Sequence, residues 1–176
     1  WNGTNVPAGT VVNFIAEGGR ITPSCSTDTN GECKVIFTSQ NPRPIDGRVS
    51  VLAYLEGDKD YYDVNGDNAY TAGVDTLTRN IGDAYRDDNE NNSYNSTIGE
   101  FIYRRGATGS CGNTSFTGIS LPTDFIQPDP NNILNRSLLT SNMTNFLSYL
   151  AQPNIDNTCD TGLAATLRHQ EIFGFA

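Results

Sequence analysis

The sequence predicts an all-β domain, a β-sandwich interrupted by one long acidic loop insertion. Short segments of alternating apolar and polar residues lie near both ends of the 176-residue chain, separated by Gly, Pro and Asn turns. Residues 56–100 hold eleven acidic and three basic residues, which is −8 of the chain's net charge of −9. We expect one domain: sandwich residues 1–56 and 159–176, an acidic loop insertion at 57–105, and an irregular or helical cover at 106–158.

Three strands are predicted before the insertion, each from alternation with a period of two. The inward faces are Val12, Phe14 and Ala16 in residues 10–16, Val35 and Phe37 in residues 33–39, and Val49, Val51, Ala53 and Leu55 in residues 47–55. Arg48 and Ser50 are expected on the outward face of the third strand. Gly18 and Gly19 end the first strand, and the prolines at 42 and 44 make a stiff turn before the third.

Inside the insertion one pattern, D-x-N-x-[DN]-N-x-Y, occurs at residues 63–70 and again at residues 87–94. Oxygen side chains at positions 1, 3 and 5 are typical of the first half of an EF-hand-type calcium loop, because alternate residues of a tight loop can direct oxygens at one cation. Asn68 and Asn92 occupy position 6, where a left-handed backbone is needed. The alternative is a solvated acidic loop that binds no metal.

The predicted calcium ligands come from both copies and from nearby acids. A bidentate Glu is expected at position 12, but Val74 and Ile98 stand there, so Asp75 and Glu100 are the nearest carboxylates able to close the loops. Asp83, between the copies, could close either one. The full set is Asp63, Asn65, Asp67, Ala69, Asp75, Asp83, Asp87, Asn89, Asn91, Ser93, Asn95 and Glu100, with Ala69 and Ser93 acting through backbone carbonyls.

Residues 5–14, 38–44 and 46–53 resemble bacterial Ig-like domains of the invasin/intimin type. Members of that group follow the strand that ends near Leu55 with an acidic D-x-N-G-N-G-x-Y-D-x-G-E insertion, which residues 63–75 and 87–100 resemble. The similarity covers about residues 5–105. It implies an Ig-like sandwich at the bacterial cell surface. The chain departs from the pattern by lacking Gly at position 6 and by placing the last acid late.

Two further segments follow the insertion. Apolar spacing in residues 131–150 predicts a helix that packs over the sandwich and stops before Pro153. Residues 164–176 predict a strand, with Leu167, Phe173 and Phe175 on one face, although a helix is the alternative. His169, the only histidine, is expected at an exposed strand position.

Four cysteines fit an oxidising compartment, where they allow three pairings. Cys25 and Cys33 flank an Asn-Gly turn, so we pair them, and Cys111 then pairs with Cys159 by elimination. Neither spacing is that of a zinc site, and free buried thiols are the alternative.

The composition argues against several classes of function. A pI near 4.4 argues against nucleic acid and anionic membranes, and no apolar run is long enough to insert in a membrane. No paired carboxylates or nucleophile motif indicate an enzyme. We expect an extracellular structural or cell-adhesion module stabilised by calcium and disulfides. The alternative is a carbohydrate-binding module, for which Tyr54, Tyr61 and Tyr62 would have to line one groove.

The expected partners are other copies of the chain or neighbouring domains of a surface protein. The chain begins at Trp1 and its one methionine is Met143, so we expect a processed chain or a fragment. In the domains that the chain resembles, a strand precedes the segment that begins at Asn5, whereas here only residues 1–4 precede it, which would leave an open sheet edge. A strand donated by a neighbouring copy, with the terminal strand as donor, would make the chain a filament subunit, whereas truncation explains the same gap without assembly.

Overall fold

A computed structural model describes residues 6–41, 43–77, 80–111 and 154–174, and it confirms an all-β fold. One short 3-10 helix, η1 (Ser96–Ile98), accompanies the strands in this part of the chain. The strands are β1 (Val11–Ala16), β2 (Arg20–Ile21), β3 (Ser24–Ser26), β4 (Phe37–Thr38), β5 (Arg48–Asp58), β6 (Tyr61–Tyr62), β7 (Thr76–Leu77), β8 (Ala84–Tyr85), β9 (Ile102–Tyr103) and β10 (Ala164–Gly174).

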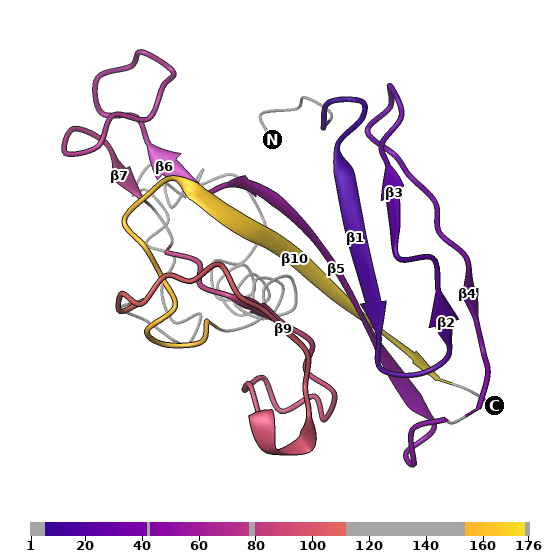
Figure 1. Ribbon diagram of the computed structural model, residues 1–176. Coiled ribbons are helices and arrows are strands. Elements are labelled where there is room, and N and C mark those ends of the chain that lie inside the picture. Colours follow the sequence, from indigo (N-terminus) through magenta and orange to yellow (C-terminus); the bar gives the residue numbers. More distant parts are fainter. Residues whose placement is uncertain (1–5, 42, 78–79, 112–153, 175–176) are drawn as a thin grey trace, which may run out of the picture.

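The largest sheet has four antiparallel strands in the order β10-β5-β1-β3. β5 and β10 pair along their whole length, from Asp58 opposite Ala164 to Arg48 opposite Gly174, and Figure 1 shows them as the two longest arrows. The terminal strand is therefore confirmed over residues 164–174, and within this structure it completes its own chain's sheet. The helix predicted at residues 131–150 lies outside the described residues.

β5 is buried on both faces in its first half, which corrects one prediction. Val49 and Val51 are buried as expected, but Ser50, predicted to face outward, is only 1% exposed. The reason is that the insertion covers this face: the Ser50 hydroxyl donates a 3.0 Å hydrogen bond to the carbonyl of Asp87. The central strand thus contacts the acidic insertion as well as the apolar core.

A two-stranded sheet of β2 and β4 packs near the end of β10. The rings of Phe37 in β4 and Phe173 in β10 stack with centroids 5.8 Å apart. Gly19, at φ +75°, allows β4 to approach, because a Cβ there would lie 2.7 Å from the Phe37 ring. The ladder of β4 is limited to Phe37 and Thr38 and is shorter than the strand predicted at 33–39.

The insertion consists of two small hairpins in sequence. β6 pairs with β7, and β8 pairs with β9, each enclosing one copy of the acidic motif. Figure 1 shows the first hairpin projecting where β5 ends and β10 begins, whereas the second loop carries η1. Both predicted disulfides, Cys25–Cys33 and Cys111–Cys159, are formed. Within the described residues, no helix has the length and apolar character needed to cross a bilayer.

Candidate metal loops

The first loop, residues 63–75, folds around its own side-chain oxygens. We number each loop from its first Asp, so that equivalent residues share a position. Oxygens at positions 1, 3 and 5 each accept a backbone N–H from a residue a few places ahead, which turns the chain around them. The bonds run to Asp63 from Gly66 (2.7 Å) and Asn68 (2.8 Å), to Asn65 from Asp67 (3.2 Å), and to Asp67 from Ala69 (2.8 Å).

The second loop, residues 87–100, repeats this arrangement. Positions 1, 3 and 5 again accept N–H bonds, and positions 5 and 7 again supply donors. The bonds run to Asp87 from Asn91 (3.2 Å) and Asn92 (2.6 Å), to Asn89 from Asn91 (3.2 Å), and to Asn91 from Ser93 (2.8 Å). The sequence repeat is therefore a structural repeat as well.

The closing acids Asp75 and Glu100 are equivalent although their spacing differs. Asp75 accepts the N–H groups at position 2 (2.9 Å) and position 9 (2.6 Å) of its loop. Glu100 accepts the N–H groups at the same two positions, at 3.2 and 2.6 Å. The second loop has one extra residue, and η1 takes it up. Each loop thus ends on a carboxylate that ties its start to its ninth residue.

Position 6 is left-handed in both loops, as predicted from the asparagines there. Asn68 and Asn92 both have φ near +60°. Asparagine tolerates this region better than other residues with a Cβ, because its short polar side chain bonds locally. The two loops therefore turn in the same direction at the same place.

Each loop is supported by a pair of tyrosines that follows the same sequence repeat. Tyr70, at position 8, packs edge-on against Tyr61 with centroids 5.5 Å apart, and Tyr94 packs edge-on against Tyr85 at 5.8 Å. The repeated sequence pattern includes the tyrosines at position 8 but not their partners just before each loop. The repeat itself was the available signal, since Tyr61 stands before the first loop where Tyr85 stands before the second.

The negative charge of each loop affects the pKa of the tyrosine that precedes it. Burial raises the pKa of Tyr85, and the negative charges of Asp87 and Glu100 raise it further against the opposing charge of Arg168. Burial and the charges of Asp63 and Asp75 likewise raise the pKa of Tyr61. Both phenols stay neutral at physiological pH and serve as packing groups.

The two loops differ in how firmly the rest of the protein holds them. Asp87 and Glu100 are each 4% exposed, and the flanking Arg86 makes two bonds to Asp88, of 2.5 and 2.9 Å. Arg48, at the start of β5, is ion-paired with Glu90. In the first loop only the closing acid, Asp75, is buried. The second loop is thus docked on the central sheet, while the first projects from it.

Glu17 adds a further carboxyl group beside the docked loop. It accepts the backbone N–H of Ser50 at 3.2 Å. Burial raises the pKa of Glu17, opposed by that hydrogen bond, and the nearby negative charge of Asp88 raises it too. This part of the molecule therefore concentrates carboxyl groups from the turn after β1 as well as from the loop.

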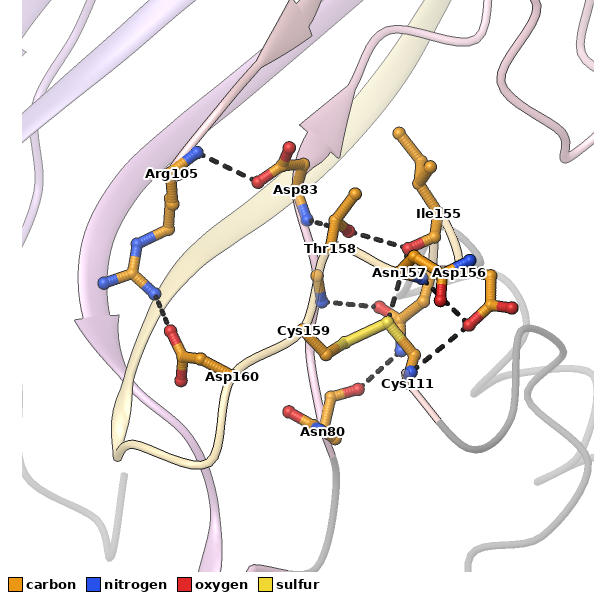
Figure 2. The surroundings of a disulfide bond; sticks show 12 residues. Asn80, Asp83, Arg105, Cys111, Ile155, Asp156, Asn157, Thr158, Cys159 and Asp160 are labelled. Carbon is orange, nitrogen blue, oxygen red and sulfur yellow. Dashed lines mark hydrogen bonds and ion pairs between the residues drawn. A yellow bond between two sulfur atoms is a disulfide. The ribbon is translucent and has the colours of Figure 1, made fainter. Parts of the chain in front are cut away.

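Asp83 lies in a different environment from the loop acids. It is 2% exposed, its carboxylate accepts the N–H of Arg105 at 2.9 Å, and its own N–H donates to Thr158 Oγ1 at 2.9 Å. Figure 2 shows these contacts beside the Cys111–Cys159 disulfide. The structure brings the other predicted ligands together in two loops but places Asp83 in the hydrogen-bond network that fixes β8 to the disulfide.

The loop oxygens suit a hard cation by their chemistry. No three His, Cys, Asp or Glu side chains converge as a metal-holding group in the described part of the chain. Positions 3, 5 and 7 would, however, also offer a cation side-chain amide oxygens and backbone carbonyl oxygens, which do not belong to His, Cys, Asp or Glu side chains. Each carboxylate oxygen that accepts one N–H keeps a second acceptor direction, so the internal hydrogen bonds do not consume the oxygens that calcium would use.

The other candidate groups are engaged elsewhere. Tyr54 packs against Phe101 and Tyr103, at 6.0 and 4.9 Å, and Tyr61 packs against Tyr70. Tyr62 is the one member of the proposed sugar-binding trio that is more than half exposed. His169 is at a surface position on β10, 2.8 Å from Glu171.

No family model, curated protein or solved structure matches this chain. The geometry of the two loops therefore carries the functional argument.

Proposed function

We propose that the protein is an extracellular structural or adhesive module with an Ig-like sandwich, stabilised by calcium and by two disulfides. One observation carries this proposal: two successive loops repeat the same acceptor positions, the same left-handed asparagine, the same closing carboxylate and the same tyrosine support. A loop that only connects strands has no need to repeat these features together.

Each loop would hold one calcium ion. In the first loop the ligands would be Asp63, Asn65, Asp67, the Ala69 carbonyl and Asp75. In the second they would be Asp87, Asn89, Asn91, the Ser93 carbonyl and Glu100, with Asn95 at the loop's edge. Calcium would neutralise part of the −8 charge of residues 56–100 and so reduce repulsion among neighbouring carboxylates.

The disulfides support a location outside the cytoplasm, because such bonds persist in oxidising compartments. The resemblance of residues 5–105 to invasin/intimin-type domains narrows this proposal to the bacterial cell surface. Calcium at the millimolar level is common outside cells, where extracellular modules bind it with modest affinity.

Chelation tests the calcium proposal. At a calcium concentration of about 100 times the Kd, each site contributes about 2.7 kcal/mol to stability. Two sites together contribute about 5 kcal/mol, so the melting temperature is expected to fall by about 10–20 °C in EDTA. Calorimetric titration should count two ions per chain. Asp63→Asn and Asp87→Asn should each remove one, whereas Asp58→Asn, an exposed acid in β5 outside both loops, should remove none. A melting curve that EDTA leaves unchanged contradicts the proposal.

Assembly into a surface filament is a narrower proposal within the same function. β10 pairs with β5 of its own chain over its full length, so its use as a donor strand would require that ladder to be exchanged between copies. Size-exclusion chromatography in calcium tests this. Polymers that disappear when β10 is locked to β5 by an engineered disulfide support strand exchange, and a stable monomer at high concentration contradicts it.

Carbohydrate binding is the second candidate, and its specific support is the exposed ring of Tyr62, 60% accessible. Tyr54 and Tyr61 pack against other aromatic rings, so a shared stacking groove has little left to use. Binding to a glycan array that Tyr62→Ala abolishes would favour this function over the structural one.

A further inference from the structure

The side-chain amide of Gln170 joins the second loop to the terminal strand. Its Oε1 accepts the backbone N–H of Asp87 at 2.9 Å, and its Nε2 donates to the carbonyl of the same residue at 2.7 Å. The amide therefore pairs with both backbone groups of Asp87, as a neighbouring strand would. Asp87 is also the first residue of the loop, and its carboxylate holds two of the loop's N–H groups.

Burial strengthens this contact. Asp87 is 4% and Ser50 1% exposed. The Ser50 hydroxyl donates to the same carbonyl at 3.0 Å and lies 3.3 Å from Gln170 Nε2. A polar group buried in this way is costly to leave without a hydrogen-bond partner. These hydrogen bonds are therefore expected to break together.

The first loop has no counterpart of this contact. Within the described residues, no side chain is hydrogen-bonded to the backbone of Asp63, the residue equivalent to Asp87. The first loop therefore opens by breaking bonds inside itself. To open, the second loop must also break its hydrogen bonds to Gln170 or move together with β10.

Gln170 lies at the start of the exposed end of β10. Residues 171–174 are all exposed, with Ile172 at 41% and Phe173 at 44%, so fraying is expected to begin at this end. Fraying that reaches Gln170 breaks both hydrogen bonds between its side-chain amide and the backbone of Asp87.

We propose that Gln170 couples the second loop to the end of the terminal strand, so that the two open and close as one unit while the first loop opens independently. The device follows from the hydrogen bonds and needs no cation. Where calcium fills the second loop, a step that rests on the proposed function, the coupling would transmit its binding to residues 168–174 and make the order of this strand end calcium-dependent.

Hydrogen exchange measured by mass spectrometry on the full, disulfide-bonded chain in EDTA tests the coupling. Gln170→Ala should speed exchange about tenfold in residues 87–95 and in residues 168–174, since two part-buried hydrogen bonds are lost. Exchange in residues 63–71 should change by less than about twofold. Gln170→Glu keeps the size and the acceptor but places a negatively charged oxygen against the Asp87 carbonyl, so it should speed exchange in the same two segments at least as much as Gln170→Ala. His169→Ala, on the neighbouring residue of the strand, is the matched control and should leave residues 87–95 unchanged.

Equal acceleration of both loops, or none in residues 87–95, would overturn the coupling. Repetition in calcium separates it from the proposed function. In the wild-type chain calcium should slow exchange in the second loop and in residues 168–174, whereas in Gln170→Ala it should slow the loop alone. If calcium changes nothing in the wild type, calcium binding fails while the coupling measured in EDTA still stands.

Discussion

Lys59 is the clearest case of a single residue whose surroundings dictate its role. Its ammonium group is fully buried and donates at 2.8 Å both to the carbonyl and to the carboxylate of Asp160. The Asp160 side chain is itself 39% exposed and also lies 3.5 Å from Arg105. Of the two partners, only Lys59 has no access to water if the pair is broken.

We therefore predict that the two ends of this pair are unequal. Asp160→Asn leaves a buried ammonium without its counter-charge and should lower the free energy of unfolding by about 2–3 kcal/mol. Lys59→Met removes the buried charge, keeps the apolar stem, and leaves Asp160 with water and Arg105, so it should cost about 1 kcal/mol or less. Urea denaturation measures both. A larger loss for Lys59→Met would contradict the argument.

The same pair predicts a pH dependence. Burial alone would raise the pKa of Asp160, but the hydrogen bond and charge of Lys59 outweigh it and hold this pKa below its usual value. A carboxyl with a lowered pKa in the folded state adds stability above its unfolded pKa of about 3.9, and loses it as the pH falls through the folded value. The stability difference between the wild type and Asp160→Asn should thus be constant near neutrality and shrink below about pH 4. A difference that grows on acidification would contradict it.

The two loops show how far sequence reasoning reaches at the scale of an element. Positions 1, 3, 5 and 6 could be assigned from spacing because they depend only on neighbouring residues. Asp75 and Glu100 were candidates for closing the loops, but spacing could not exclude Asp83, because the choice depends on η1 accommodating one extra residue in the second loop and on the contacts of Asp83 with other segments. The burial of Ser50 was missed for a related reason: alternation along β5 says nothing about a loop that covers its second face.

The left-handed turn at position 6 gives a prediction for both loops. Asn92→Ala should destabilise the protein by about 1 kcal/mol, because alanine has a Cβ and no polar group to bond locally at φ near +60°. Asn92→Gly should be neutral or stabilising, since glycine adopts this conformation freely. Thermal melting of the pair, and of Asn68→Ala and Asn68→Gly as the same test in the first loop, provides the check. Equal stability of the alanine and glycine variants would count against it.

At the scale of the whole molecule, the long strands could be predicted, but the short strands of the insertion and the order of the strands in the sheet could not. β5 and β10 were each recognisable from alternation, yet their pairing joins segments far apart in the sequence, which local periodicity does not encode. The disulfide pairing was accessible because four cysteines leave few choices and Cys25 and Cys33 flank one turn.

The two disulfides should contribute unequally to global stability. Cys25 and Cys33 are 8 positions apart in the sequence, whereas Cys111 and Cys159 are 48 positions apart. Loop-closure entropy assigns about 2.5 kcal/mol to the shorter link and about 4 kcal/mol to the longer. The double variants Cys25→Ser/Cys33→Ser and Cys111→Ser/Cys159→Ser, compared by chemical denaturation, should differ in that order. A greater loss from the shorter link would show that native-state contacts dominate instead.

The long ladder between β5 and β10 also sets the order of events when the chain refolds from denaturant. Lys59 and Asp160, neighbours at one end of this ladder, are 101 residues apart in the chain, whereas each acidic hairpin closes within a single short segment. Closing a large loop costs more entropy than closing a small one, and non-local contacts form slowly. The hairpins should therefore acquire structure early, and the central sheet should be sealed last, by the strand nearest the carboxyl end.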